Sequence, residues 1–366
     1  MLSSLSERAA IIPGGSMTRS KKIFGRWASH AEGAIITDVD GNDYIDMGCG
    51  LGAISLGYKP RQLYGSGVCT LPYAVEIEAA EVVLKHVAPW ASHVRFTKTG
   101  SEATHAAYRI AKAATGRSRV LVAKGAYHGW HEWCERADQC EHIEYSNARL
   151  CVVDPSIDAE DVAAVFVEPR RFSPMTADEL RSLKIMTERW GALLVFDEMI
   201  WGGRWALGGC TEYHGVTPDL ACFGKAFGNG QSVAFVVGRD ALRDHGEIVS
   251  GTFSGDSIGL QSLCDTLETY ISEPVIQTMW DRARQLRGGF SMMVPKSFAS
   301  LSATAPLMGI TYANPEHKLP FVEAMAQRGV LTFGGWLMTC YAHTPEHIER
   351  VVEACADAAK SVTRGT

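Results

Sequence analysis

Long apolar segments and closely paired cysteines are both missing from this sequence of 366 residues. The longest apolar runs are short, strand-like pieces such as residues 233–237, far below the roughly 18 residues that a membrane-spanning helix requires. The ten cysteines form no C-x-x-C pair, which is typical of reduced, mostly buried thiols and not of a disulfide framework. Residues 1–16 lack a basic region followed by an apolar stretch, so we expect no secretory signal and predict a cytoplasmic location.

A large excess of one charge is also missing, because 35 Lys and Arg stand against 41 Asp and Glu, for a net charge of −6. Proteins that bind nucleic acid or an anionic membrane usually carry a basic excess, so we expect neither partner. The sequence contains no Gly/Ser-rich linker, low-complexity stretch or internal repeat. With 46% apolar and 21% charged residues, the composition is that of an ordinary globular protein.

Short apolar runs alternate with helical patterns through the middle of the chain, at residues 119–123, 163–167, 192–196, 220–223 and 233–237. Each run has the length and continuous apolar character of a strand that is buried on both faces of a sheet. Alanines and Ile110 recur at helical spacing over residues 103–114, and Gly116 follows as a stop signal. Residues 177–190 form a second helical pattern. The alternation predicts βαβ units, an α/β fold and a mostly parallel sheet.

The C-terminal part of the chain predicts a further helix, with Thr344 as N-cap and Pro345 in its first turn. Apolar residues from Ile348 to Val362 fall on one face, so we expect this helix to pack against a neighbour. We predict three segments. Residues 1–55 contribute to a small domain, residues 56–265 form a large domain, and residues 266–366 form the C-terminal part of the small domain.

Histidine and cysteine gather within fifteen residues at His128, His131, Cys134, Cys140 and His142. The C-x5-C spacing in this group matches none of the usual zinc-ligand patterns. We therefore predict no metal site here.

Two reactive side chains each follow a predicted strand. Asp197 comes directly after the run 192–196, and Lys225 follows the run 220–223 after a single glycine. Ligands of open α/β sheets collect beyond the carboxyl ends of the strands, where both side chains would lie. Pyridoxal phosphate (PLP) requires an amine that forms a Schiff base and a carboxylate that keeps the ring nitrogen protonated. The pair therefore predicts a PLP site.

Residues 94–104 have the pattern of a strand, a turn and a helix, in which Thr99 and Glu102 have capping-box spacing. Gly100 allows a ligand to approach the backbone closely, and the first-turn N–H groups with the Ser101 hydroxyl form an anion cradle. A capped helix start is common without any ligand. The Lys225–Asp197 pair favours the interpretation as a phosphate site.

Motifs along nearly the whole chain resemble those of class III PLP-dependent aminotransferases, and within them the glutamate-1-semialdehyde aminomutase branch. They lie at residues 12–15, 38–46, 99–103, 127–129, 197–209, 215–225, 251–255 and 342–344. The chain is shorter than is usual for this family. The resemblance implies a fold-type I structure, with a seven-stranded, mostly parallel sheet in the large domain and a small α+β domain built from both termini.

The resemblance also assigns cofactor-binding roles. Lys225 would form the Schiff base and Asp197 would contact the ring nitrogen. The matching family motifs supply the remaining cofactor-binding residues, Gly100, Ser101, Tyr127, His128, Glu168 and Thr252. In this assignment the helix start at Gly100 and Ser101 would hold the phosphate, Tyr127 would stack on the ring, and Glu168 would lie near the phenolic edge.

Assembly and substrate contacts are further implications of the resemblance. Thr252 would reach the phosphate bound by a neighbouring subunit, so we expect a homodimer with shared active sites. Arg19 lies near the position of a carboxylate-binding arginine, and Trp130 and Trp201 are candidates for walls of the substrate pocket. Arg170 and Arg171 replace the usual small-residue turn after Glu168-Pro169, and the sequence assigns them no role.

Three functions remain open from the sequence. An aminomutase must retain its diamino intermediate under a closing lid, whereas a transaminase releases its first product. The segment after Trp133 lacks the long Gly/Pro-rich insertion that forms the aminomutase lid. We therefore predict an aminotransferase that moves an amino group from a small-molecule donor to a carbonyl acceptor. The alternatives are a glutamate-1-semialdehyde aminomutase and a protein of this fold that binds PLP without turnover.

Overall fold

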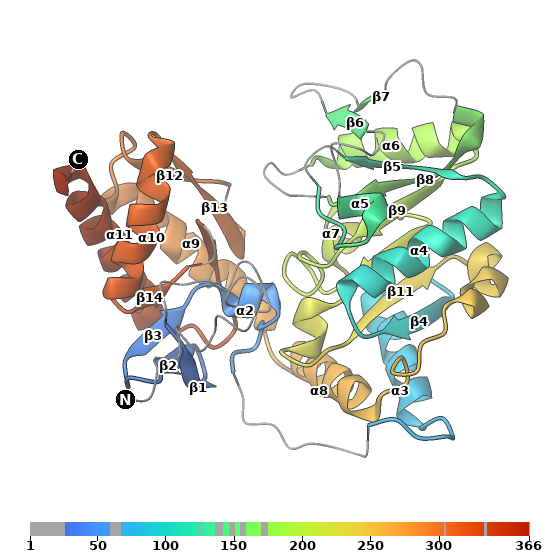
Figure 1. The fold of residues 1–366 in the computed structure, drawn as a ribbon, viewed down its shortest axis with the longest axis horizontal. Helices are drawn as coiled ribbons and strands as arrows, with labels where there is room; N and C mark the ends of the chain where they lie inside the picture. The colour runs from blue at the N-terminus through green and yellow to red at the C-terminus, as the bar shows by residue number, and fades with distance from the viewer. Residues whose placement is uncertain are drawn as a thin grey trace, which may run out of the picture. The chain divides into compact units, whose positions relative to one another are not determined.

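The computed structural model describes residues 26–58, 67–123, 126–135, 142–145, 151–153, 159–169, 175–303, 305–332 and 335–365 (Figure 1). The chain divides into two compact units. The first, here called the sheet unit, is Gln62–Ile276; the second, the terminal unit, combines Met1–Arg61 with Gln277–Thr366. The domain boundaries drawn from the sequence at residues 55 and 265 stay a prediction.

A sheet of eight strands forms the centre of the sheet unit (Figure 1). Its strands are β4 (His93–Thr97), β5 (Arg119–Ala123), β6 (His142–Tyr145), β7 (Cys151–Val153), β8 (Val162–Val167), β9 (Leu193–Asp197), β10 (Leu220–Phe223) and β11 (Ala234–Gly238). Their order is β4-β11-β10-β9-β8-β5-β6-β7. The α/β prediction is confirmed. The sheet has one strand more than the seven that the resemblance implies, because the short β7 pairs with the β6 edge.

Strand direction places several strand ends at one edge of this sheet. Strands β10, β9, β8, β5 and β6 pair in parallel, whereas β11 is antiparallel to both β10 and β4. Two antiparallel pairings in succession return β4 to the direction of β10. The carboxyl ends of β4, β5, β8, β9 and β10 therefore lie together, at the edge where α/β sheets bind ligands.

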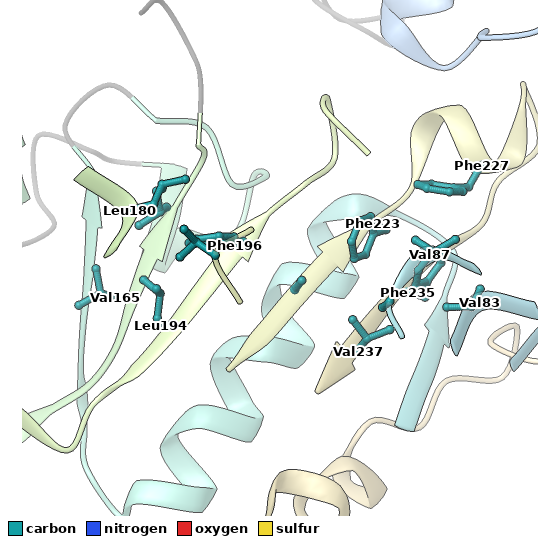
Figure 2. Packing of buried hydrophobic residues seen from close by; sticks show 14 of the residues in the cluster. Val83, Val87, Val165, Leu180, Leu194, Phe196, Phe223, Phe227, Phe235 and Val237 are labelled. Atoms are coloured by element: carbon teal, nitrogen blue, oxygen red, sulfur yellow. The ribbon is translucent and has the colours of Figure 1, made fainter. Parts of the chain in front are cut away.

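The core of the sheet unit is a cluster of buried apolar side chains that Figure 2 shows from close by. Phe223 stacks on Phe235 with ring centroids 5.3 Å apart, and Phe227 meets Phe235 edge-on at 5.4 Å. Further along the sheet, Val165 and Phe196 are fully buried. Burial of each such side chain contributes about 1.5–3 kcal/mol, so the apolar strands hold the edge of the sheet rigid.

Helices and single turns connect the strands of the sheet unit: α3 (Val75–Val82), η3 (Val83–Val87), α4 (Gly100–Thr115), α5 (Glu132–Glu135), η4 (Ala159–Asp161), α6 (Ala177–Trp190), α7 (Gly209–His214), η5 (Lys225–Gly228), η6 (Asp240–Ile248) and α8 (Ser257–Ser272). Both predicted helices, α4 and α6, are confirmed. Each begins with a capping box and ends at a left-handed glycine, Gly116 or Gly191. Glycine adopts this backbone conformation without steric cost.

The terminal unit has two small sheets and several helices. Its strands are β1 (Ala28–Glu32), β2 (Ile35–Asp38), β3 (Asp43–Asp46), β12 (Ala299–Leu301), β13 (Leu307–Tyr312), β14 (Val330–Leu331) and β15 (Trp336–Met338). Its helical segments are α2 (Cys49–Gly52), η7 (Pro315–His317), α10 (Lys318–Gln327) and α11 (Pro345–Gly365), and α9 (Val275–Met293) enters it from the sheet unit.

Both ends of the chain contribute to one sheet of the terminal unit. Strand β14 pairs in parallel with β3, so that Val330 lies opposite Ile45. Helix α11 buries Ile348, Val351 and Cys355, which confirms the predicted apolar face. Among the helices that the structure describes, none combines the length and the apolar character needed to cross a bilayer.

Candidate active site

Asp197 and Lys225 lie at the ligand-binding edge of the sheet, on neighbouring strands. Asp197 is the last residue of β9 and pairs with Cys222 of β10. Lys225 follows β10 after Gly224 and has a left-handed backbone with φ of +49°. A non-glycine residue rarely adopts this conformation, and such outliers cluster at functional sites. The parallel sheet therefore brings the predicted amine and carboxylate to the same edge.

The Asp197 carboxylate is almost completely buried and is held by two donors. Its Oδ2 lies 2.8 Å from Nδ1 of His128, and its Oδ1 accepts the backbone N–H of Met199 at 3.1 Å. An ionised carboxylate offers about four acceptor positions, so this arrangement leaves room for a protonated ring nitrogen. The sequence indicated His128 only through the family motif. Its contact with Asp197 links the segment after β5 to the end of β9.

Helix α4 begins at the same edge, directly after β4. Its capping box is complete, because Thr99 Oγ1 accepts the N–H of Glu102 at 3.2 Å and Glu102 Oε2 accepts the N–H of Thr99 at 3.0 Å. The Ser101 hydroxyl oxygen accepts the N–H of Trp130 at 3.3 Å. The N–H groups of the first turn have no partners within the helix, so the helix start has the donors that a phosphate needs.

Two glycines at this site allow close packing that a side chain would block. A Cβ on Gly129, where φ is +110°, would lie 2.5 Å from Ser101 Oγ. A Cβ on Gly100 would lie 2.9 Å from the sulfur of Met199. The Gly129 contact fixes the segment after β5 against the start of α4, and so places His128 beside Asp197.

Tyr127 and Glu168 follow the ends of β5 and β8 and contact each other. The N–H of Tyr127 donates to Glu168 Oε2 at 3.4 Å. The tyrosine is 52% exposed. The candidate substrate residue Arg19 lies outside the described residues, as do Arg170 and Arg171, to which the sequence assigned no role.

The two candidate substrate tryptophans have different surroundings. Trp130 is 67% exposed and stacks on His131 with ring centroids 5.3 Å apart. Trp201 is only 1% exposed and packs against Trp205 at 5.6 Å. Trp201 therefore belongs to the packed interior of the described sheet unit, whereas Trp130 is open to a ligand.

Thr252 lies in an exposed turn before α8. The end of this turn is anchored by Asp256, whose Oδ2 accepts the Gly259 N–H at 2.8 Å and pairs with Lys98 Nζ at 2.7 Å. Lys98 immediately precedes the cap of α4 in the sequence. The ion pair thus joins the Thr252 turn to the predicted phosphate site, a link that sequence reasoning missed because the partners are far apart along the chain.

Sequence reasoning also gave no role to Glu198, the residue after Asp197. Its carboxylate is buried and accepts the N–H groups of Cys210 and Thr211 at 3.0 Å and 2.9 Å, and the Thr211 hydroxyl at 2.9 Å. Burial raises the pKa of Glu198 to about 7, although these three hydrogen bonds oppose the shift. Glu198 therefore ties the end of β9 to α7.

Comparison with known proteins places this geometry in context. The family model described as aminotransferase class-III matches residues 16–135 and 134–358. The chain is 27% identical to 3-aminobutyryl-CoA aminotransferase of Cloacimonas acidaminovorans, over 92% of this chain and 89% of that protein. It is 28% identical to glutamate-1-semialdehyde 2,1-aminomutase of Archaeoglobus fulgidus, over 96% of this chain and 97% of the relative.

A solved structure has the same fold over nearly the whole chain. It is the FumI protein of Sphingopyxis sp. MTA144 in its PLP internal aldimine form, with a TM-score of 0.90 and 27% identity. The match covers 98% of this chain and 96% of the other.

Proposed function

Because the chain belongs to the class-III aminotransferase family, a family of PLP-dependent enzymes, we propose that it transfers an amino group between two separate small molecules. The donor is an amine or amino acid and the acceptor is a keto acid or aldehyde. The observation that supports this most directly is the placement of Asp197 and Lys225 at the ends of neighbouring parallel strands, with Asp197 buried against His128.

Each polar residue at the edge has a proposed task. When bound, PLP supplies an electron-withdrawing ring that makes a proton on the substrate carbon removable. Lys225 would hold the cofactor covalently and, once released by the substrate amine, would act as the base that moves this proton. Asp197 would keep a proton on the ring nitrogen, and His128 would orient the carboxylate for that contact.

The remaining edge residues would position the cofactor. The first turn of α4, with Gly100 and Ser101, would bind the phosphate through N–H groups and a hydroxyl. Tyr127 would stack on the ring, and Glu168 would lie near its phenolic edge. The exposed Thr252 would complete the phosphate site of a second subunit, which makes the proposed active form a homodimer.

Substrate contacts and location are also proposals. Of the candidate substrate residues, the exposed Trp130 is better placed than the packed Trp201 to contact a ligand. Arg19 stays a candidate for a substrate carboxylate, outside the described residues. The cytoplasmic location stays a prediction from the sequence.

An aminomutase is the second candidate, and the similarity to the Archaeoglobus enzyme supports it. An aminomutase retains its intermediate under a lid, and the short connection after Trp133 lacks the long insertion that forms one. This difference favours exchange of the amino group with external molecules over isomerisation within one molecule. A protein that binds PLP without turnover is the third candidate. The buried Asp197–His128 pair, with Lys225 following the neighbouring strand, argues against it.

A half-reaction experiment separates the candidates. A panel of amino donors is added singly to the PLP-loaded protein, without any carbonyl acceptor. We expect one donor class to remove the absorbance of the lysine-bound cofactor and to release one carbonyl product per site. A keto acid or aldehyde should then restore the starting absorbance.

Two other results would contradict the proposal. Rapid isomerisation of glutamate-1-semialdehyde without exchange of labelled amino groups with added donors would identify an aminomutase. Stable PLP binding with no spectral change on addition of any donor would identify a binding protein.

A further inference from the structure

Two thiols and an imidazole meet inside the terminal unit. Cys49, Cys340 and His343 bring two sulfur atoms and a ring nitrogen within 4.8 Å of one another. All three side chains are buried, with at most 2% of their surface exposed. Cys49 lies at the start of α2 and Cys340 lies just after β15, so the cluster joins the two ends of the chain. Neither the family motifs nor the proposed reaction uses these thiols.

The backbone that presents Cys49 is held in an uncommon conformation. Cys49 has a φ of +46° and Leu51 has a φ of +61°, a left-handed conformation that is sterically unfavourable for residues other than glycine. The carboxylate of Asp46 holds this turn, because it accepts the N–H groups of Gly48 at 2.8 Å and Gly50 at 3.1 Å. The turn therefore keeps the Cys49 sulfur beside Cys340.

The donor set fits a metal ion poorly. Nδ1 of His343 accepts the backbone N–H of Cys340 at 2.9 Å, so its lone pair is in use. A neutral imidazole then carries its proton on Nε2, so neither ring nitrogen offers a lone pair to a metal ion. A tetrahedral site also needs a fourth ligand. Both carboxylate oxygens of Asp46 are engaged, since Oδ2 also accepts the hydroxyl of Tyr58 at 2.5 Å. Two adjacent thiols without a spare ligand favour sulfur–sulfur chemistry over metal coordination.

We propose that Cys49 and Cys340 form a redox-active pair that hydrogen peroxide converts to a disulfide. The Cys340 thiolate attacks one peroxide oxygen, the O–O bond breaks, and hydroxide leaves, so that the sulfur becomes a sulfenic acid. The Cys49 sulfur then attacks the Cys340 sulfur as its proton passes to the departing hydroxide. The S–S bond forms, the S–O bond breaks, and water leaves. In total, two thiols and one peroxide give one disulfide and two waters.

Cys340 is the residue that reacts first. Its pKa is held well below the usual range for a thiol, first because the Cys49 thiol donates to its sulfur, and then because His343 lies beside it. The thiolate is the reactive form of cysteine. Because both thiols are buried, only an oxidant close to water in size can reach them. Hydrogen peroxide meets this requirement, and a bulky disulfide does not.

The test uses the purified full-length chain, treated with hydrogen peroxide, quenched with catalase and alkylated in denaturant. We expect the loss of two alkylatable thiols per chain. Peptide mapping without reductant should show the Cys49 peptide joined to the Cys340 peptide, and dithiothreitol should restore both thiols. These readouts do not depend on aminotransferase activity, so they stand whether or not the proposed function is correct.

Variants assign the two roles. Cys49→Ser should leave Cys340 as a sulfenic acid that dimedone traps, whereas Cys340→Ser should abolish both the crosslink and the trapped product. His343→Gln should slow the reaction at neutral pH, because it removes one of the groups that favour the thiolate of Cys340. Cys69→Ser, which removes an exposed cysteine, is the matched control and should leave the crosslink unchanged.

Two results would overturn the proposal. One is a peroxide-treated protein in which Cys49 and Cys340 both stay alkylatable while other cysteines are oxidised. The other is a stoichiometric metal ion in the untreated protein that is lost in Cys49→Ser, because this would make the cluster a metal site. Circular dichroism is the control that each variant is folded, and only folded variants are compared.

Discussion

The sheet unit and the terminal unit both bury titratable side chains, but they assemble them differently. In the sheet unit, Asp197 and Glu198 are neighbours in sequence at the end of one strand, and each accepts hydrogen bonds from elements beside that strand. In the terminal unit, Cys49 and Cys340 come from opposite ends of the chain and meet through the packing of small sheets. Only the first arrangement leaves a continuous motif in the sequence.

The difference follows from the chemistry of the groups. A buried carboxylate must have donors, and the ends of parallel strands and the starts of helices supply them close by. A buried thiol behaves as a small apolar side chain and can be packed almost anywhere. Strand-end carboxylates in this protein therefore mark the proposed reaction site, while the thiols need the folded structure to be recognised as a pair.

The largest expected effect is a loss of turnover that follows the removal of a lysine from the sheet unit and not from the terminal unit. Lys225→Ala should lower turnover by roughly 10³-fold or more, because both the covalent attachment and the base are lost. Lys360→Ala, which removes an exposed lysine of the terminal unit, should leave turnover unchanged. Borohydride reduction and peptide mapping should place the pyridoxyl group on Lys225. Labelling of another lysine would refute the assignment, and circular dichroism checks that the variant is folded.

Asp197→Asn should lower turnover by about 10²–10³-fold, the usual cost of one preorganised electrostatic contact. An amide cannot hold a proton on the ring nitrogen, although it can still occupy the buried position beside His128. The half-reaction rate with a saturating donor is the measurement. An Asn variant that keeps the full rate while binding PLP normally would show that the ring nitrogen is held by another group.

Two buried carboxyl groups, one in each unit, should contribute to stability with opposite pH dependence. Burial raises the folded-state pKa of Glu198 from 4.5 to about 7, so its contribution is full below pH 4.5 and falls as the pH rises through 7. The loss is about 3 kcal/mol over this window. In the terminal unit, burial of Asp38 favours a higher pKa, but hydrogen bonds from Asn42 and Tyr44 outweigh it and lower the pKa to about 2. The contribution of Asp38 is therefore lost only as the pH falls from 3.8 through 2.

Urea unfolding at several pH values measures this contrast. Between pH 4.5 and 7 the contribution of Glu198 should fall with rising pH, and Glu198→Gln should remove this part of the pH dependence. The contribution of Asp38 should be lost only at the acid end, and Asp38→Asn should remove this part of the acid dependence. A slope in the sheet unit that is unchanged by Glu198→Gln would mean that another group causes it.

A smaller effect tests the proposed subunit contact. Thr252→Ala should weaken PLP retention by about 1–2 kcal/mol, the value of a hydrogen bond to a charged group. Ser250→Ala removes a hydroxyl from an exposed position just before the same turn and should leave retention unchanged. Dialysis followed by absorbance measures retention, and light scattering measures assembly. A fully active, PLP-loaded monomer would refute the shared site.

The smallest effect compares two capped helices of the sheet unit. Thr99→Ala and Thr176→Ala should each cost about 1 kcal/mol of stability, because each removes the side-chain cap of a helix. Only Thr99→Ala should also weaken PLP retention, since α4 begins at the proposed phosphate site and α6 does not. Equal PLP retention in the two variants would indicate that the start of α4 is only a structural cap.

The sequence by itself predicted the main strands and helices of the sheet unit and the presence of a PLP site. The apolar runs at residues 192–196 and 220–223 became β9 and β10, because a strand buried on both faces must be apolar throughout. The helical pattern at residues 177–190 became α6, with its capping box and glycine stop. Strand direction then followed from the alternation of strands and helices, so Asp197 and Lys225 were predicted at the same edge.

Tertiary structure alone decided the contacts between distant segments. Three such contacts leave no periodic pattern in the sequence. They are the hydrogen bond between His128 and Asp197, the hydrogen bond from the Thr211 N–H to Glu198, and the contact of Cys49 with Cys340. Propensity and periodicity report on neighbours along the chain. These contacts depend instead on which side chains from separate elements fill the same space, and on which donors remain there to satisfy a buried polar group.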